Sequence, residues 1–337
     1  MEATAVELVA PGKGILAADE SGPTIQKRFK SIEVASSEES RRAYREMLFT
    51  TPGLGAFISG VILYDETIRQ KAADGTALVK VLTRQNIIPG IKVDKGAKAL
   101  AGFPGEKVTE GLDGLRDRLA EYAQLGARFT KWRAVMLINA NIPTRTCIKT
   151  NVHALARFAA LSQEAGLVPI VEPEVLMDGA HTLARHYEVT EATLQALFQQ
   201  LHEHRVHLEG LLLKVNMVLS GTTCLQQATV AEGAHATRRC MERTVPAAVP
   251  GSVFLSGGQS DVRATEHLDS INRIEPEHVP WQLSFSFGRA LQEPALKAWA
   301  GVAENAAAAQ NALLQRARCN SAARFGQYSA DMEVTAA

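Results

Sequence analysis

Short apolar runs alternate with amphipathic segments along most of the chain. Each run has the length of a buried strand, and the segments between them have the apolar spacing of helices that pack one face against a core. The pattern predicts eight strands, at 15–19, 57–64, 87–94, 129–137, 167–174, 208–218, 252–257 and 282–288. It predicts helices at 37–49, 113–125, 152–165, 191–204 and 231–243.

Eight strands that alternate with helices over 337 residues are typical of a (β/α)8 TIM barrel of the α/β class. A doubly wound sheet usually has fewer strands and a glycine-rich nucleotide turn, and no GxGxxG sequence follows the first run. The Ala-rich segment 294–317 is expected to form one long helix that closes the barrel. We therefore predict a single barrel domain over 1–317 and a mobile C-terminal tail over 318–337.

Charged residues stand near the ends of five of the predicted strands, where apolar strands do not normally carry them. They are Asp19, Lys92, Asp94, Lys131, Arg133, Glu172, Glu174 and Lys214. Strand side chains alternate between two faces, and late positions of barrel strands lie near the C-terminal mouth, so these groups are expected to converge. A structural ion pair explains any one of them equally well. Five strands with this feature favour a functional site, because a charge cluster that only stabilised the fold could be replaced by apolar packing.

Lys214 has the most apolar surroundings of any lysine in the chain, since three leucines precede it and the sequence VNMV follows it. A lysine attacks a carbonyl only as the neutral amine, and burial together with a neighbouring cation favours that form. Lys131, two strands earlier, is the expected neighbour and a candidate proton carrier. These features predict a nucleophilic role for Lys214.

Glycines follow the last two predicted strands, in Ser256-Gly257-Gly258 and in Gly288-Arg289. The loops at these two positions frequently bind phosphate in TIM barrels. Glycine lets backbone N–H groups approach an anion closely, and an arginine can add a bidentate contact. Either glycine motif alone indicates only a turn, but the two together favour a phosphate site.

Composition mainly excludes other classes of protein. Lys+Arg and Asp+Glu each number 36, so the chain lacks the basic excess typical of nucleic-acid and membrane-surface binders. We find no secretory signal pattern and no apolar stretch long enough to span a bilayer.

The cysteines and histidines indicate neither a metal site nor a disulfide framework. The cysteines are scattered and form no CxxC pair, which argues against a zinc ribbon and against a disulfide framework. A reducing, cytoplasmic location is therefore expected. The spacing of His202 and His204 does not place both on one helix face, so no metal site is predicted.

With these residues in place, the chain resembles class I fructose-bisphosphate aldolases from residue 12 to about residue 299. The matching segments are KGILAADES (13–21), GLG (53–55), ISGVIL (58–63), GIKVDKG (90–96), KWR (131–133), PIVEPE (169–174), LLK (212–214), FLSGGQS (254–260) and FSFGRALQ (285–292). So many long matches in the same order make the resemblance highly specific.

The resemblance implies reversible cleavage of fructose 1,6-bisphosphate to dihydroxyacetone phosphate and glyceraldehyde 3-phosphate, in glycolysis, gluconeogenesis or carbon fixation. Lys214 would form the Schiff base, Glu172 would serve as acid and base in carbinolamine dehydration, and Asp19 would take the proton of the C4 hydroxyl. The remaining expected catalytic residues are Lys131, Arg133 and Glu174. The iminium is the electron sink in this chemistry, so no metal or other cofactor is expected.

The resemblance also implies two phosphate sites. Residues that match the C1-phosphate pocket, with their immediate neighbours, are Ser256, Gly257, Gly258, Ser286, Gly288 and Arg289. Residues that match the region near the C6 phosphate are Ser21, Thr24, Lys27, Arg28 and Lys92. The expected partners are sugar phosphates and further copies of the chain in a homotetramer, without nucleic acid or membrane.

Two alternatives stay open at this point. Another Schiff-base barrel, such as a transaldolase or a 2-keto acid aldolase, shares the lysine chemistry, although a 2-keto acid enzyme needs a carboxylate contact in place of one phosphate. A non-catalytic scaffold with the same fold is the second alternative. The complete set of Asp19, Lys131, Glu172 and Lys214 argues against a scaffold.

Overall fold

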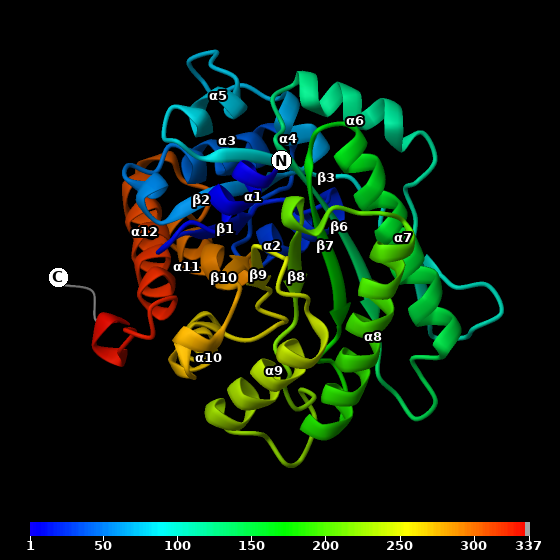
Figure 1. Cartoon of the computed structure of the whole chain (residues 1–337). Helices are drawn as coiled ribbons and strands as arrows, with labels where there is room; N and C mark the ends of the chain where they lie inside the picture. The colour runs from blue at the N-terminus through cyan, green and yellow to red at the C-terminus, as the bar shows by residue number, and fades with distance from the viewer. Residues whose placement is uncertain (334–337) are drawn as a thin grey trace.

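Eight parallel strands close into a barrel in the computed structural model, which describes residues 1–333 (Figure 1). The barrel strands are β1 (Gly14–Ala17), β2 (Ile58–Leu63), β3 (Ile88–Lys92), β6 (Phe129–Met136), β7 (Val168–Val175), β8 (Leu212–Val215), β9 (Gly251–Phe254) and β10 (Gln282–Phe287). They follow one another around the barrel in sequence order, and β10 pairs with β1 to close it. Each strand overlaps one of the predicted runs, so the prediction of a (β/α)8 barrel is confirmed. The run at 208–218 is longer than its strand, because its first part forms a short 3-10 helix.

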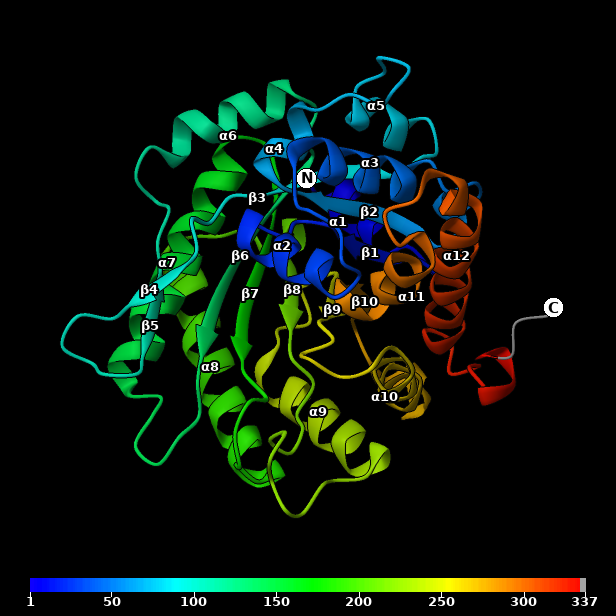
Figure 2. The ribbon, with the colours of Figure 1, turned by 180° about the vertical axis from the view of Figure 1, so that it is seen from behind.

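Helices cover the outside of the barrel, where most of them connect successive strands and the last two follow the final strand (Figure 2). They are α2 (Gly22–Lys30), α3 (Glu38–Phe49), α4 (Asp65–Arg69), α5 (Leu78–Thr83), α6 (Leu115–Gln124), α7 (Arg145–Glu164), α8 (Leu183–Glu203), α9 (Val230–Thr244), α10 (Asp261–Arg273), α11 (Arg289–Trp299) and α12 (Ala306–Ala323). Short 3-10 helices are η1 (Leu54–Ala56), η2 (Leu208–Gly210), η3 (Pro276–His278), η4 (Ala303–Asn305) and η5 (Ala330–Glu333). An antiparallel hairpin of β4 (Ala97–Ala99) and β5 (Lys107–Thr109) lies between β3 and α6. No helix within residues 1–333 is long and apolar enough to cross a membrane.

Apolar side chains fill the N-terminal end of the barrel interior, and α1 (Glu2–Leu8) closes it from outside. Phe129 of β6 lies in this apolar cluster and is fully buried. Its ring occupies space left by glycine, since a Cβ at Gly90 would come within 2.3 Å of a ring carbon and a Cβ at Gly60 within 3.1 Å. The cluster consists of Ala5, Leu8, Val9, Ile15, Ala17, Ile62, Ile88, Phe129, Val168, Ile170, Leu212 and Val253. This end of the interior is close-packed hydrocarbon.

The predicted closing helix is two helices in the structure. α11 ends at Trp299 and α12 begins at Ala306. Between them Ala300 and Gly301 adopt left-handed φ values of 49° and 78°, which interrupt the right-handed helix. The predicted domain boundary at residue 317 falls inside α12.

The segment after α12 packs against α10 and α12. Tyr328 is buried, and its backbone N–H donates to Asp269 Oδ1 at 2.8 Å while its hydroxyl donates to Glu333 Oε1 at 2.7 Å. Arg316 of α12 also pairs with Glu333. Residues up to Glu333 therefore contact the folded body, and residues 334–337 of the predicted tail lie outside the described residues.

Candidate active site

The alternation of side chains along the barrel strands places a layer of charged groups directly above the apolar cluster. On β6, Phe129 belongs to the apolar cluster and Lys131 follows two residues later. On β7, Ile170 and Glu172 have the same relation. Lys214 of β8 completes the charged layer. The sequence-based expectation that late-strand charges converge at the mouth matches this arrangement.

Four of these side chains form one connected network. Lys131 Nζ lies 2.6 Å from Asp19 Oδ2 and 3.1 Å from Glu172 Oε2. Lys214 Nζ lies 3.1 Å from the other oxygen of that glutamate, Oε1. The side chains of Lys131, Glu172 and Lys214 are only 4%, 4% and 5% exposed. One buried carboxylate is therefore held between two lysine amines.

The network fixes the charge of its carboxylates. Burial raises the pKa of Asp19, but the attraction of Lys131, and after it of Lys214, outweighs burial and holds that pKa well below its usual value. Burial also raises the pKa of Glu172, and again the two lysines outweigh it, with help from Arg133, so that pKa is lowered as well. Both carboxylates are ionised at neutral pH and can accept a proton.

Lys131 is the central cation of the network. Burial lowers its pKa, but Asp19 and Glu172 outweigh burial and raise the pKa above its usual value. Lys131 is therefore a permanent positive charge at neutral pH. Such a charge stabilises oxyanions and can donate a hydrogen bond, but it does not act as a free nucleophile.

The charged layer opens into a cavity of about 600 Å³ at the C-terminal ends of the strands. All of the predicted site residues except Lys27 line this cavity. They are Asp19, Ser21, Thr24, Arg28, Lys92, Lys131, Arg133, Glu172, Glu174, Lys214, Ser256, Gly257, Gly258, Ser286, Gly288 and Arg289. A cavity of this size suits a small-molecule ligand.

Two rims of the cavity carry polar groups suited to anions. At the β9 and β10 ends, Arg289 Nη2 donates to the backbone oxygen of Gly258 and, at 3.0 Å, to that of Gln259, so the two loops are tied together. α11 begins at this residue, and a helix N-terminus attracts negative charge. At the β3 end, Lys92 Nζ lies 2.7 Å from Asp94 Oδ1.

Arg28 lies nearer to the β10 rim than its predicted assignment to the C6 group suggests. A Cβ placed on Gly288 would lie 3.4 Å from Arg28 Nη2. Arg28 also pairs with Glu20, which Arg45 contacts from the other side at 2.7 Å. Gln292 Nε2 of α11 donates to the same glutamate at 2.9 Å. The arginine is therefore held in place from behind the cavity.

Lys27 is the one predicted site residue that the structure does not bring to the cavity. Its side chain is exposed on α2. Ser21, Thr24 and Arg28 are spaced by three and four residues and so share one side of the helix, whereas Lys27 lies off that side. We leave Lys27 out of the phosphate site for this reason.

Several residues that the sequence did not single out also line the cavity. Examples are Glu20, Met177, Asp178 and Thr222. Asp94, named earlier as a strand-end charge, lines it too, and its Oδ2 accepts from the backbone N–H of Arg133 at 3.1 Å. The i, i+2 spacing from Lys92 was a usable signal for Asp94, but no comparable pattern marks the loop residues after β7 and β8.

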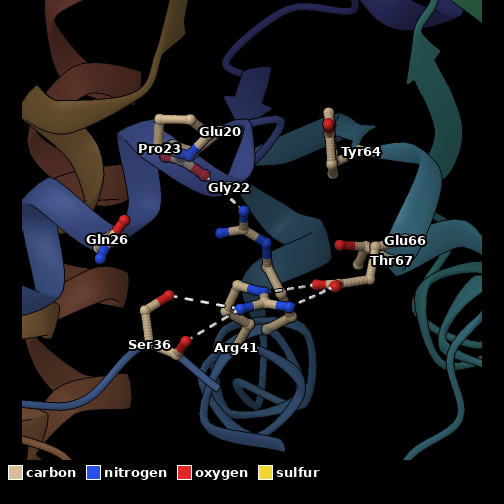
Figure 3. Close-up of a pocket in the computed structure, with 10 residues that line it drawn as sticks. Glu20, Gly22, Pro23, Gln26, Ser36, Arg41, Tyr64, Glu66 and Thr67 are labelled. Atoms are coloured by element: carbon tan, nitrogen blue, oxygen red, sulfur yellow. Dashed lines mark hydrogen bonds and ion pairs between the residues drawn. The ribbon is translucent and has the colours of Figure 1, made fainter. Parts of the chain in front are cut away.

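A second cavity of about 460 Å³ is shown in Figure 3. It shares Glu20 with the first cavity. Its charges are already paired. Arg41 Nε donates to Glu66 Oε1 at 2.7 Å (Figure 3). Arg45 pairs with Glu20 at 2.7 Å. In the described part of the chain, no lysine is among the residues that line this cavity, so it offers no amine that could attack a carbonyl. Within residues 1–333, no group of three or more His, Cys, Asp or Glu side chains is arranged to hold a metal ion.

Comparison with known families identifies the group to which these residues belong. A family model described as "Fructose-bisphosphate aldolase class-I" matches residues 1–337. The chain belongs to this family. It is an enzyme of the class I fructose-bisphosphate aldolase type, a carbon–carbon lyase.

Individual relatives, all named as aldolases, match this chain over nearly its whole length. The chain is 57% identical over 326 residues to a "Probable fructose-bisphosphate aldolase class 1" of Xanthomonas axonopodis pv. citri, covering 96% of this chain and 97% of the relative. It is 52% identical to "Fructose-bisphosphate aldolase 6, cytosolic" of Arabidopsis thaliana, covering 98% and 92% of the two chains. A solved Plasmodium falciparum aldolase, in complex with TRAP and a small-molecule inhibitor, superposes with a TM-score of 0.96 at 49% identity, covering 97% of this chain and 94% of that one.

Proposed function

We propose that this chain cleaves and forms fructose 1,6-bisphosphate reversibly through a Schiff base on Lys214. The observation that carries the proposal is the contact of Lys214 Nζ with Glu172 Oε1 at 3.1 Å, inside a cavity that Arg28, Lys92 and Arg289 also line. The amine is the nucleophile, and the carboxylate beside it is ionised and able to take a proton.

The first half of the reaction uses the Lys214 and Glu172 pair. The amine adds to the C2 carbonyl, and Glu172 takes the proton that the nitrogen loses and passes it to the C2 oxygen, which gives the neutral carbinolamine. Glu172 then takes up one proton from solvent and donates it to the C2 hydroxyl, which leaves as water and gives the iminium. Because one carboxylate lies within 3.1 Å of the amine, it can serve in both directions without a second group.

Carbon–carbon cleavage uses Asp19 and Lys131. Asp19 accepts the proton of the C4 hydroxyl while the C3–C4 electron pair moves into the iminium, so glyceraldehyde 3-phosphate leaves and an enamine remains. Lys131, at 2.6 Å from Asp19, holds this carboxylate ionised and in place. Protonation of the enamine carbon and hydrolysis of the imine release dihydroxyacetone phosphate. The iminium is the electron sink, and the residues named supply the proton transfers.

The polar rims would hold the two phosphates. We assign Ser256, Gly257, Ser286, Gly288 and Arg289, with Gly258 behind them, to one phosphate. Ser21, Thr24 and Lys92 are assigned to the other, with Arg28 between the two groups. Binding both ends of the substrate fixes C2 against the amine, and this binding energy lowers the entropic part of the barrier.

The proposal is tested by coupled assays of fructose bisphosphate cleavage. We expect the wild type to cleave it, Lys214→Met to lose about 10³-fold or more in kcat, and the exposed Lys80→Met control to match the wild type. Cleavage should persist after prolonged treatment with a chelator. A wild type that cleaves 2-keto acid substrates but not the sugar bisphosphate would contradict the proposal.

We also infer a cytoplasmic location and a homo-oligomeric state. The location is supported by the word "cytosolic" in the name of the Arabidopsis relative and by four unpaired cysteine thiols. The homotetramer rests on the family resemblance alone, and light scattering of the purified protein tests it. The pathway, whether glycolysis, gluconeogenesis or carbon fixation, follows from the same resemblance.

A further inference from the structure

The two strands that carry Glu172 and Lys214 separate from each other just where these residues stand. The backbone ladder between β7 and β8 ends at Val171 and Leu213. On its other side, β7 stays paired with β6 as far as Val175. β8 likewise stays paired with β9 to its last residue. Pairing between β7 and β8 therefore holds Glu172 and Lys214 only from below, through Val171 and Leu213, and does not hold the two strand ends together beyond them.

Two buried side chains bridge this gap instead, and both bind Val175 at the end of β7. Asn216 Oδ1, two residues after Lys214, accepts from the backbone N–H of Val175 at 3.0 Å. His186 of α8 contacts the carbonyl of the same residue through Nε2 at 3.2 Å. Its other ring nitrogen, Nδ1, accepts from the backbone N–H of Leu219 at 2.9 Å. His186 is fully buried.

These contacts determine which nitrogen of the His186 ring carries the proton. A backbone N–H only donates, so Nδ1 must carry the lone pair that faces Leu219, and Nε2 must carry the proton that faces the carbonyl of Val175. Burial, with the nearby His181 ring, lowers the pKa of His186 to about 4, so this neutral form prevails at neutral pH. One imidazole thus joins the end of β7 to the loop after β8.

Beyond the bridge, the loops after β7 and β8 meet again at the rim of the cavity. The N–H of Thr222 donates to the carbonyl of Met177 at 2.8 Å, and both residues line the cavity. The close approach requires a glycine at 221, where a Cβ would lie 2.2 Å from the carbonyl oxygen of Gly179. The His186 bridge therefore lies beyond the reacting pair, between that pair and the rim of the cavity.

We propose that His186 is a positioning residue, which sets the distance between the Glu172 carboxylate and the Lys214 amine by holding the diverging ends of β7 and β8. The proposal rests on the function proposed above for that pair. Proton transfer between the two groups requires hydrogen-bond reach, and a displacement of about 1 Å costs on the order of 10²-fold in rate. His186 touches neither group, and it acts through the backbone that carries them.

The chain offers a matched set of variants. Glutamine at this position can still accept with its oxygen and donate with its nitrogen, whereas leucine and phenylalanine fill the space without hydrogen bonds. The control is His181→Leu, because the His181 ring stacks on His186 with centroids 5.0 Å apart and its nitrogens have no hydrogen-bond partner within residues 1–333. The His181→Leu variant removes the imidazole that stacks on His186 but leaves the hydrogen bonds of His186 in place.

We expect His186→Leu to lower kcat for fructose bisphosphate cleavage by about 10- to 100-fold with KM changed less than about threefold. His186→Gln should stay within about threefold of the wild-type kcat, and His181→Leu should match the wild type. Assays are run well below the melting temperature of each variant, so a simple loss of folded protein does not account for a kcat effect. If His186→Leu does not fold, His186→Phe is compared with His186→Gln.

The outcomes separate this proposal from the function on which it rests. A wild type that forms no borohydride-trapped adduct at Lys214 defeats the Schiff-base function itself. A wild type that traps normally, together with a wild-type kcat in His186→Leu or equal kcat values in His186→Gln and His186→Phe, overturns the positioning role. A kcat loss in His181→Leu as large as that in His186→Leu overturns it as well.

Discussion

The two halves of the barrel interior are built from the same strands and have opposite chemistry. The lower half is an apolar cluster around Phe129, and the upper half is a charged network around Lys131. These residues are two positions apart on β6. The lower half gains stability from close packing, whereas the upper half places charges in a poorly solvated layer that apolar packing would stabilise better. We interpret the lower half as the support of the fold and the upper half as the part kept for chemistry.

The largest effect on stability is expected in the lower half, from Phe129→Ala. The ring is fully buried against Gly60 and Gly90, so its removal leaves a cavity and should cost about 3–5 kcal/mol of unfolding free energy. Urea unfolding measures this loss, with Phe325→Ala as a control, because Phe325 is 54% exposed. A loss below about 1 kcal/mol would show that the lower half does not support the fold.

In the upper half, Lys131→Met should reduce both activity and stability. Cleavage should fall by at least about 10²-fold in kcat, and the unfolding free energy by about 3 kcal/mol at neutral pH, because two buried carboxylates lose their shared cation. Folding lowers the pKa values of Asp19 and Glu172, so their ionised forms stabilise the wild type above about pH 4.5, and this contribution is lost as the pH falls.

The pH dependence of this variant tests the cause directly. The stability difference between the wild type and Lys131→Met should be largest at neutral pH and should shrink below about pH 4, where the carboxylates of the variant are protonated. Denaturant unfolding at a series of pH values measures it. A difference that stays constant from pH 7 to pH 3 would mean that Lys131 stabilises the fold by packing and not by charge.

Gly90→Ala should destabilise the protein by about 1–3 kcal/mol, since the added methyl group would overlap the Phe129 ring at 2.3 Å. The double variant Gly90→Ala/Phe129→Leu should lose less unfolding free energy than the sum of the losses in the two single variants. Thermal unfolding of the four proteins in this cycle gives the coupling. Strict additivity would contradict the contact between these two positions.

At the rim, Arg28→Ala and Lys27→Ala should differ although the residues are neighbours in the sequence. Arg28 lines the cavity, so its loss should raise KM for the sugar bisphosphate by about tenfold or more. Lys27 is exposed outside the cavity, and its loss should change KM by less than about twofold. An equal rise in KM in the two variants would mean that Lys27 also binds the phosphate.

The strands and the charged layer were predictable because both leave local signals. Parallel barrel strands are buried on both faces and so form apolar runs, and a charge such as Lys131 or Glu172 near the end of such a run is conspicuous. The short N-terminal helix α1 leaves too few residues for a clear periodicity, and its role as the lower closure of the barrel depends on distant strands.

Features that depend on three-dimensional context were missed. The spacing of Ser21, Thr24 and Arg28 sets Lys27 apart on α2, but it excludes Lys27 from the site only once the side of α2 that faces the cavity is known. The break at Ala300 and Gly301 was hidden because alanine is a strong helix former on both sides of it. His186 showed no motif, since its partners are backbone groups of a strand and a loop that only the fold brings together.

The central claim is that the Lys214 amine attacks the substrate carbonyl, and borohydride trapping tests it most directly. The wild type is incubated with dihydroxyacetone phosphate, reduced, digested and mapped by mass spectrometry, with Lys131→Met and Lys214→Met treated in parallel. We predict a single reduced adduct on Lys214 in the wild type and none in Lys214→Met. An adduct on Lys131 or on any other lysine of the wild type would contradict the account.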